Sequence, residues 1–234
     1  MMKVVTIISG GLDSVGYSIK WDGPSVKLYP LVFDYGQKGR KEIEAAVELS
    51  KKLGFEKPKV LDISFMTELW GGTQLTDNEV TVEEVYTPSV VVPIRNAIFL
   101  TIGTAYAYTI GANKVIYGSH LGDCKPSEDS ENLWFAQYPD CSPEFVLALE
   151  AALRVGHFRQ NRDLEIWSPA REGMTKVDIL LTAYHLLGKD KDLIFSTWSC
   201  YKLGETHCGV CESCRNRKVT FEEAGIKDLT KYAN

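Results

Sequence analysis

The sequence has no excess of basic residues, since 26 Lys and Arg stand against 31 Asp and Glu for a net charge of -5. This balance argues against a broad nucleic-acid-binding surface, although it permits a local basic patch. The sequence also lacks an apolar run of membrane length. The longest apolar region, Ile98 to Ala112, is short and is interrupted by Thr, Tyr and Gly. We therefore expect neither direct nucleic-acid binding nor a membrane location.

Secretory and low-complexity features are also absent from the sequence. The first apolar run, Val4 to Ile8, is too short for a signal peptide and is followed by Gly-Gly, so we expect a cytoplasmic protein. There is no internal repeat.

A chain of 234 residues that is 44% hydrophobic and 24% charged forms one large domain or one domain with an appendage. In a reducing compartment its six cysteines indicate metal binding or chemistry before disulfides.

The most informative stretch begins with that first apolar run. Val4 to Ile8 has the β-branched composition of a buried central strand. It leads into Ser9-Gly10-Gly11-Leu12-Asp13-Ser14, and a helix is expected from Ser14. The two glycines allow a tight turn and a close approach of ligand to backbone. Successive N–H groups at a helix N-terminus form an anion site, and an ordinary Gly-Gly turn is the alternative.

The string differs from the commoner phosphate-binding motifs, because it has no Lys before Ser14 and no Gly-x-Gly-x-x-Gly spacing. It resembles the PP-loop of the ATP pyrophosphatases, adenylating enzymes whose loop holds the diphosphate that departs. Ser9 to Ser14 are therefore predicted to bind the β,γ-diphosphate of ATP. The hydroxyls of Ser9 and Ser14 would serve as added donors.

Strands and helices alternate along the rest of the chain. Strands are expected over 4–8, 26–33, 60–63, 114–117 and 164–167, and helices from residue 14, over 38–53, 96–108 and 143–155, and after the cap Thr175. The stretch 65–88 has no clean period. This alternation predicts an α/β fold with a doubly wound, mainly parallel sheet. Ser9–Ser14, Asp34–Gly36 and Ser119–Asp123 each follow a strand, so they should converge on one cleft.

Four cysteines fall within fifteen residues near the C-terminus, as Cys200, Cys208, Cys211 and Cys214. Four thiolates complete a closed tetrahedral zinc site, whose role would be structural. Iron–sulfur ligation and a redox Cys-x-x-Cys pair are the alternatives. His207 is a substitute ligand, but with four cysteines we expect it outside the ligand set or exposed to solvent. We predict a zinc-binding segment over 200–234, packed on an α/β domain over 1–199.

Together these motifs extend the resemblance to nearly the full length of the chain. The sequence resembles the 7-cyano-7-deazaguanine synthase family in five further segments: Asp34-Tyr35-Gly36-Gln37, Val92-Pro93-Ile94-Arg95-Asn96, Tyr138-Pro139-Asp140-Cys141, Thr197-Trp198-Ser199-Cys200-Tyr201 and the run from His207 to Arg215. The first motif, Ser9 to Ser14, is shared with other PP-loop enzymes. The Tyr-Pro-Asp-Cys segment and the four-cysteine tail are much more specific to this family.

The resemblance implies a reaction and a set of site residues. A ligase would convert 7-carboxy-7-deazaguanine, ammonia and ATP into a nitrile through two adenylations, releasing AMP and pyrophosphate, with Mg²⁺ accompanying the nucleotide. The resemblance also implies a homodimer. The implied catalytic residues are Asp13, Ser14, Arg95 and Lys176. The implied nucleotide-binding residues are Ser9, Gly10, Gly11, Leu12, Asp13, Ser14, Asp34 and Tyr35, and the implied substrate-binding residues are Arg95, Asn96, Asp123 and Asp140.

Each of these positions has a plainer interpretation. Arg95 would otherwise form a surface ion pair, Lys176 would be a solvated helix lysine, and Asn96 would only cap its helix. The segment 118–138 is longer than is usual in the family, and Ser142 stands where Arg is common, so either Asp123 or Asp140 could face the base. Rival functions are a PP-loop enzyme that thiolates tRNA through Cys124 or Cys141, and a zinc-ribbon binding module.

Overall fold

Five strands form one parallel sheet in the computed structural model of the chain, which describes residues 1–125, 137–158 and 164–233. The strands are β1 (Met2–Ile7), β2 (Val26–Asp34), β3 (Lys59–Asp62), β4 (Lys114–Ile116) and β5 (Glu165–Trp167). Their order across the sheet is β3-β2-β1-β4-β5, and every neighbouring pair is parallel. The order reverses between β1 and β4. The carboxyl ends of these two strands therefore flank the position where such sheets bind ligands.

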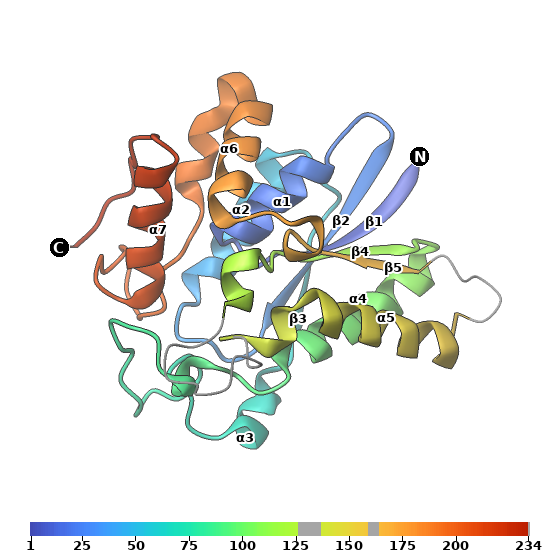
Figure 1. Cartoon of the computed structure of the whole chain (residues 1–234), viewed down its shortest axis with the longest axis horizontal. Coiled ribbons are helices and arrows are strands. Elements are labelled where there is room, and N and C mark those ends of the chain that lie inside the picture. The colour runs from blue at the N-terminus through green and yellow to red at the C-terminus, as the bar shows by residue number, and fades with distance from the viewer. Residues whose placement is uncertain (126–136, 159–163, 234) are drawn as a thin grey trace.

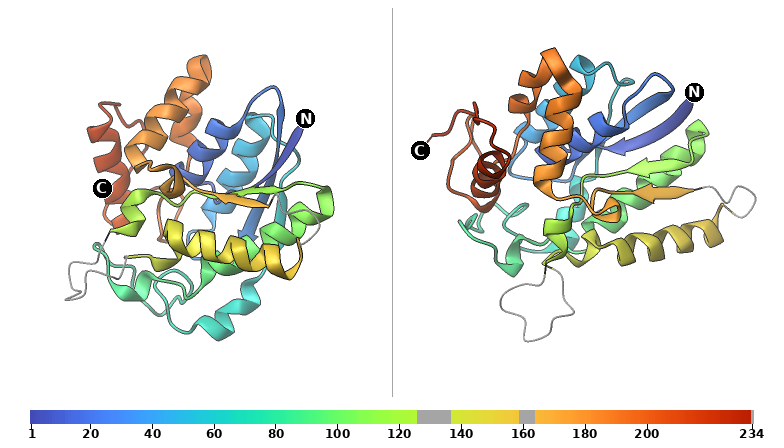
Figure 2. Two further views of the ribbon diagram at one scale, coloured as in Figure 1. Left: turned by 45° about the vertical axis from the view of Figure 1, so that its right-hand side comes forward. Right: turned by 45° about the horizontal axis from the view of Figure 1, so that its top comes forward.

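Helices cover both faces of the sheet, as Figures 1 and 2 show. The longer helices are α1 (Leu12–Trp21), α2 (Lys41–Lys52), α4 (Arg95–Ile110), α5 (Pro143–Gly156), α6 (Lys176–Leu187) and α7 (Glu212–Glu223). Side chains of α1, α2 and α6 share one core cluster, whereas those of α4 and α5 share another. This arrangement confirms the predicted doubly wound α/β fold.

Alternation along the central strands builds the two core layers. Val5 and Ile7 of β1 pack with the side chains of α4 and α5, whereas Ile8, just past the strand, packs with those of α1, α2 and α6. Successive side chains of a strand point to opposite faces, so one apolar run supplies both layers. This explains why β1 carries buried residues on both faces from Val4 to Ile7, with Thr6 as the only polar one among them.

The predicted elements are all present, with shifted ends. The helix expected from Ser14 begins two residues earlier, at Leu12, and the helix expected over 96–108 extends over Arg95–Ile110. The stretch without a clean period contains only the short helix α3 (Thr67–Trp70) and turns of 3-10 helix. Residues 126–136 of the segment 118–138, and residues 159–163 before β5, lie outside the described residues.

The C-terminal segment packs on the sheet's α1/α2/α6 side. Phe221 of α7 is buried in the same cluster as Ile8 and Leu12, and Arg217 of α7 is fully buried, where its guanidinium donates to the Thr197 hydroxyl at 2.8 Å. In Figure 1 α7 lies beside α6 at the edge of the molecule. These contacts agree with a tail packed on the α/β domain, while the boundary at residue 199 stays a prediction.

One apolar stretch, Pro88–Ile110, is long and apolar enough to cross a membrane by length and composition alone. It includes α4, which buries Leu100, Gly103, Thr104 and Ala107. Leu100 and Ala107 belong to the core cluster that contains β1 side chains. A core helix that covers a sheet passes the same length and composition test, and these contacts favour that interpretation.

Candidate functional site

The Ser9–Ser14 segment joins β1 to α1 and presents backbone donors at the switch point of the sheet. Gly11 is the N-cap of α1, and no side chain caps the helix. The two serines are held together, with their Oγ atoms 3.1 Å apart, and the Ser9 N–H donates to Ser14 Oγ at 3.1 Å. Among the described residues, no acceptor faces the N–H groups of Leu12, Asp13 and Ser14. Such a helix N-terminus binds anions.

Two glycines fix the position of this loop. Gly10 has φ +86°, and a Cβ atom there would lie 2.1 Å from the Glu42 carbonyl oxygen of α2. Gly118, just after β4, passes so close to the loop that a Cβ atom would lie 2.5 Å from the Ser14 backbone nitrogen. Only glycine fits at either position. The importance of Gly10 follows from its motif, whereas that of Gly118 depends on a contact between distant segments.

Asp13 and Lys176 form an ion pair over the loop. Lys176 lies in the first turn of α6, and its Nζ is 2.8 Å from Asp13 Oδ2. Burial opposes the charge on Asp13, but the Lys176 ammonium and the His120 imidazole outweigh burial, so the pKa of Asp13 lies below its usual value. Asp13 Oδ1 is buried without a hydrogen-bond partner among the described residues. Lys176 is therefore not merely a solvated helix lysine.

His120 is a member of this cluster that the sequence did not single out. Its Nε2 lies 3.9 Å from Asp13 Oδ2 and 3.6 Å from Asp123 Oδ1, and its backbone N–H donates to Asp123 Oδ2 at 3.0 Å. Burial raises the pKa of Asp123, and the nearby His120 partly opposes this shift. The tips after β1 and β4 therefore meet as predicted. Asp123 therefore lies close to the phosphate loop, with His120 between it and Asp13.

Arg95 lies at the start of α4 and faces the end of β2. Its Nη1 donates to the Tyr35 hydroxyl at 3.2 Å, and its guanidinium stands 5.4 Å from the centre of the Tyr35 ring. Burial opposes the charge on Arg95, but Tyr35 and Asp140 outweigh it, so the pKa of Arg95 is raised. Arg95 has no ion pair with a carboxylate among the described residues. The surface ion pair considered from the sequence is therefore wrong.

The second candidate acid, Asp140, lies at the same end of α4. Its Oδ2 accepts the backbone N–H of Asn96 at 3.1 Å, while the Asn96 amide donates to Cys141 Sγ at 3.3 Å. The expectation that Asn96 only caps its helix is wrong, because the N-cap is Ile94, in a left-handed conformation with φ +49°. Asp140 thus neighbours Arg95, whereas Asp123 neighbours the phosphate loop.

Asp34 and Tyr35 end β2 and are held firmly. Asp34 accepts the Gly36 N–H at 3.2 Å and pairs with Arg40. The Tyr35 ring is buried and contacts Trp70 edge-on, with ring centres 6.1 Å apart. A nucleotide bound at this strand end would therefore contact the Asp34 carboxylate and the Tyr35 backbone rather than the buried Tyr35 ring. Their role in binding ATP stays a prediction.

Glu42 is a further carboxylate that sequence reasoning missed. It lies on α2, directly behind Gly10, and its Oε1 accepts the Gln37 amide at 2.9 Å. Gln37 is itself held, because its Oε1 accepts the Tyr35 N–H and its amide also donates to the Phe33 carbonyl. Burial raises the pKa of Glu42 to about 7.

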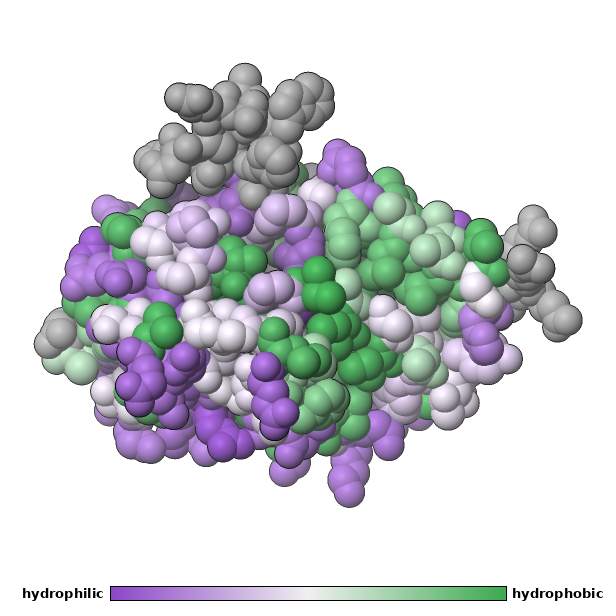
Figure 3. All heavy atoms as spheres, turned by 90° about the horizontal axis from the view of Figure 1, so that it is seen from below, coloured by the Kyte–Doolittle hydropathy of each residue, from purple (hydrophilic) through white to green (hydrophobic). Residues whose placement is uncertain are grey.

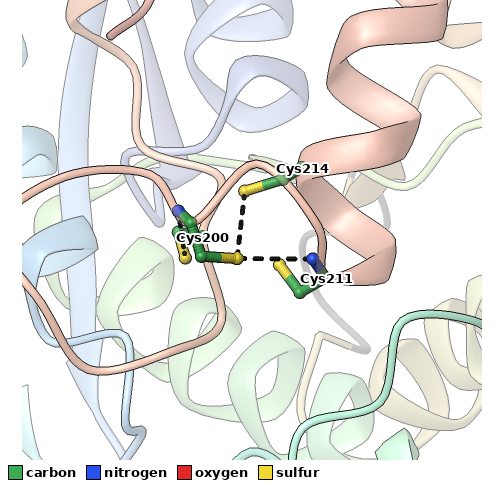
Figure 4. Close-up of side chains that lie close together, drawn as sticks. Cys200, Cys211 and Cys214 are labelled. Carbon is green, nitrogen blue, oxygen red and sulfur yellow. Dashed lines mark hydrogen bonds between the residues drawn. The ribbon is translucent and has the colours of Figure 1, made fainter. Parts of the chain in front are cut away.

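The four predicted cysteines form one cluster. All four Sγ atoms lie within 4.8 Å of one another. Cys208 and Cys214 have sulfurs 4.0 Å apart, close to the roughly 3.8 Å separation that a tetrahedral site with 2.3 Å zinc–sulfur bonds requires. Figure 4 shows Cys200, Cys211 and Cys214 turning their sulfurs toward one another, with Cys211 and Cys214 at the start of α7. The cluster fits a metal ion, and the helix N-terminus favours thiolate charge there.

The other predicted features of this region have definite places. His207 is 5% exposed, its Nε2 accepts the Ser199 N–H at 3.0 Å, and its ring lies against Trp198. It is outside the cysteine cluster, and the alternative of a solvent-exposed ring is wrong. Burial raises the pKa of the Cys141 thiol and brings that of Cys124 to about 11. Neither thiol is therefore activated as a nucleophile.

The comparisons with known proteins agree with this arrangement. A family model described as "Queuosine biosynthesis protein QueC" matches residues 3–225. A 7-cyano-7-deazaguanine synthase 1 of Colwellia psychrerythraea is 39% identical, and the alignment covers 98% of this chain and 98% of that protein. A 7-cyano-7-deazaguanine synthase of Pseudoalteromonas translucida is 36% identical, again with 98% of both chains covered.

Among solved structures, a 4-thiouridine synthetase bound to RNA and ATP superposes with a TM-score of 0.51 at 16% identity. The match covers 95% of this chain and 53% of that one, so the present chain spans about half of its length. Likeness at this identity concerns the fold alone. The family match over residues 3–225 and the full-length relatives decide the assignment: the chain belongs to the QueC family and is an enzyme of the 7-cyano-7-deazaguanine synthase kind.

Proposed function

We propose that the protein converts 7-carboxy-7-deazaguanine and ammonia into 7-cyano-7-deazaguanine at the expense of ATP, which leaves as AMP and pyrophosphate. The observation that carries this proposal is the loop at the switch point. There the first N–H groups of α1 have no acceptor among the described residues, and Asp13 pairs with Lys176. Family membership supports the nitrile product and its use in queuosine biosynthesis. The carboxylic acid, and archaeosine as an alternative destination, follow from the resemblance of the sequence motifs.

The loop would bind the diphosphate of ATP. The N–H groups of Leu12, Asp13 and Ser14 donate to phosphate oxygens, and Lys176 neutralises charge on the departing pyrophosphate. The serine hydroxyls, which now bond to each other, would rotate toward the ligand. Both rounds of chemistry reuse this site, because each releases the same pyrophosphate.

The substrate would lie between the loop and the start of α4. Arg95 can fork onto the carboxylate and hold it in line with the α-phosphate. A carboxylate is a poor electrophile, and attack of its oxygen on the α-phosphate gives an acyl-adenylate with AMP as a good leaving group. Ammonia then gives the amide, and adenylation of the amide oxygen allows AMP to leave as the nitrile forms. Asn96 with Asp123 or Asp140 would orient the base.

Two metal ions belong to this proposal. The buried Asp13 Oδ1, which has no partner among the described residues, fits an oxygen ligand of Mg²⁺. Mg²⁺ would supply neutralisation of phosphate charge. At the cluster of Cys200, Cys208, Cys211 and Cys214, four sulfurs fit zinc, and the closed ligand set leaves no position for a substrate. Zinc would therefore hold the tail in place.

The direct test is incubation of the protein with ATP, ammonium and 7-carboxy-7-deazaguanine. AMP and pyrophosphate should appear in step with the nitrile, and only when the deazaguanine is present. Formation of ADP and phosphate, or turnover that requires tRNA, would contradict the proposal.

Variants of the loop test the assigned roles. Lys176→Ala removes the ammonium that faces the loop, and loss of such an electrostatic contact should lower kcat by about 100-fold. Ser14→Ala and Asp13→Ala should lower nitrile formation as well. Lys189→Ala, which removes an exposed lysine just beyond α6, is the matched control and should retain activity. Undiminished nitrile output from folded, metal-loaded Asp13→Ala protein would exclude this site.

Two rival functions fit the site less well. A thiolating enzyme needs a reactive thiol, yet the pKa values of Cys124 and Cys141 are raised. A zinc-ribbon binding module leaves the phosphate loop without a role. If nucleic acid were the partner, its binding would weaken steeply with added salt.

The remaining expectations concern location and assembly. A cytoplasmic location, a homodimer and the absence of direct nucleic-acid binding stay predictions. Figure 3 shows apolar residues gathered over the underside of the molecule, where α4 and α5 lie in Figure 1. The exposed side chains there include Ile94, Tyr108, Leu147 and Val155. Substitution of these side chains by charged residues, followed by mass measurement in solution, tests whether they form the dimer contact.

A further inference from the structure

A small cavity lies behind the phosphate loop, on the side of α2. It has a volume of about 10 Å³ and is lined by Tyr35, Gln37, Gly39, Glu42, Leu75 and Tyr201. A space of this size holds one molecule as large as water. It is too small for a purine or a nucleotide. Ammonium has nearly the size of water, so size alone selects one of the proposed reaction's three substrates.

The polar groups of the cavity suit a small cation. Glu42 Oε1 accepts the Gln37 amide, but no described residue donates to Glu42 Oε2. Gln37 offers less, because its Oε1 is a neutral amide oxygen that already accepts the Tyr35 N–H. Tyr35 and Tyr201 also line the cavity, together with Gly39 and Leu75. Aromatic side chains attract cations. The free carboxylate oxygen is therefore the main polar partner for a guest.

The cavity adjoins the reaction site on two sides. The backbone carbonyl of Glu42 lies directly against Gly10, so the turn of α2 that carries the Glu42 side chain adjoins the phosphate loop. Tyr35, which also lines the cavity, accepts a hydrogen bond from Arg95, the residue assigned to the substrate carboxylate. A molecule released from the cavity therefore has the loop and the carboxylate site as its nearest neighbours.

We propose that this cavity is the ammonium site of the enzyme, an inference that rests on the proposed function. Ammonium would bind to Glu42 Oε2 and give up one proton to it. The N–H bond breaks, its electron pair stays on nitrogen as the lone pair of ammonia, and the proton forms an O–H bond on Glu42. Ammonia then attacks the adenylated carbon and forms the C–N bond, and AMP leaves with the electron pair of the broken C–O bond. The surplus proton on the new ammonium nitrogen passes to solvent, which leaves the neutral amide, and Glu42 returns its own proton to solvent.

The properties of Glu42 fit this task. Its pKa, raised by burial to about 7, makes it a base matched to neutral pH. Arg95 is the one nearby charged group that lowers this pKa. It holds the carboxylate partly ionised, so the cavity can accept a cation and then hold its proton.

The test separates ammonium use from adenylation in the full-length, metal-loaded enzyme. Glu42→Gln keeps the shape and the Gln37 contact but removes the charge-assisted bond to ammonium, so KM for ammonium should rise about tenfold or more. KM for ATP and for 7-carboxy-7-deazaguanine should not change. Exchange of labelled pyrophosphate into ATP, driven by the acid without ammonium, should continue at the wild-type rate. Glu42→Asp should recover part of the ammonium affinity.

Glu44→Gln is the matched control, since Glu44 is on the same helix with a side chain 71% exposed. A Glu42→Gln enzyme that behaves like this control would overturn the ammonium site. A raised KM for the deazaguanine would overturn it as well, because Glu42 would then read the base. Loss of exchange in folded Glu42→Gln protein would assign the residue to adenylation instead. Absence of exchange in the wild-type enzyme would overturn the proposed function itself.

Discussion

The phosphate loop and the four-cysteine cluster are both short runs of unusual residues, yet they keep their shape by different means. The loop is fixed by the fold, because Gly10 lies against α2 and Gly118 lies against Ser14. The cluster has fewer buried supports: Val82 is the other buried core residue grouped with its cysteines, and Trp198, Tyr201 and Tyr232 pack there only partly buried. Its four sulfurs, gathered within 4.8 Å, would repel one another as thiolates without a cation. The loop is thus preorganised by packing, whereas the cluster depends on its ion.

Metal removal should give the largest effect and separates the two regions most sharply. Chelation removes a binding free energy on the order of 10 kcal/mol from the tail, so the segment around α7 should lose its order. Hydrogen exchange measured by mass spectrometry should show fast exchange over 200–225 after chelation. The β1–α1 segment should exchange more slowly than the tail. Simultaneous loss of protection in both regions would show that the tail supports the whole sheet.

Gly10→Ala tests the phosphate loop, the region that packing holds in place. The added Cβ would collide with the Glu42 carbonyl oxygen at 2.1 Å, in a backbone with φ +86°. We expect a loss of roughly 2–4 kcal/mol in unfolding free energy and loss of pyrophosphate exchange, with zinc content unchanged. Denaturant unfolding and metal analysis measure the two effects.

Gly54→Ala is the control for backbone strain alone. Gly54 has φ +74°, but nothing lies within 4 Å of an added Cβ. Its loss of stability should therefore be smaller, and exchange should remain. Equal effects from both substitutions would mean that conformation, rather than packing against α2, fixes the loop.

The sequence predicted what depends on local pattern. The strand before Ser9 and the cap Thr175 are encoded within a few residues, and each was found where expected. The helix after Gly11 was found as well, although it begins at Leu12 rather than at Ser14. The cysteine cluster was found for the same reason, since three of its four ligands lie within seven residues.

The missed features depend on contacts between segments far apart in the chain. His120 meets Asp13, and Glu42 meets Gly10, only after α1 and α2 have packed on the sheet. The helix after Pro93 begins one residue early because Ile94 adopts a left-handed conformation, which is rare for a β-branched residue. The Asp123–Asp140 choice could not be made from spacing, because each acid accepts a hydrogen bond from a different backbone segment.

Glu42→Gln tests how the packing behind the phosphate loop makes the unfolding free energy depend on pH. The folded-state pKa of Glu42 is raised from 4.5 to about 7, so its neutral form is favoured by folding. The resulting stabilisation is complete below the unfolded pKa and is lost as pH rises toward 7. Gln stays neutral, so above pH 7 the variant should be more stable than wild type by about 2 kcal/mol, allowing for partial exposure. Urea unfolding at pH 5 and pH 8 measures the difference in unfolding free energy between the variant and wild type. An equal difference at both pH values would exclude the raised pKa of Glu42 as its cause.

Thr175→Ala should give the smallest change and asks how far the loop depends on one helix cap. The Thr175 hydroxyl accepts the Asp178 N–H at 3.2 Å, and Asp178 accepts the Thr175 N–H in return at 2.8 Å. Removing the hydroxyl should cost about 1 kcal/mol of unfolding free energy. Lys176 is the next residue, so a loosened first turn of α6 should also weaken its contact with Asp13 and raise KM for ATP a few-fold. Thr109→Ala, which removes an exposed hydroxyl bonded only within α4, should leave KM for ATP unchanged. If Thr175→Ala lowers stability but leaves KM unchanged, Lys176 is positioned by Asp13 rather than by the cap, and the loop is preorganised even more completely than its packing indicates.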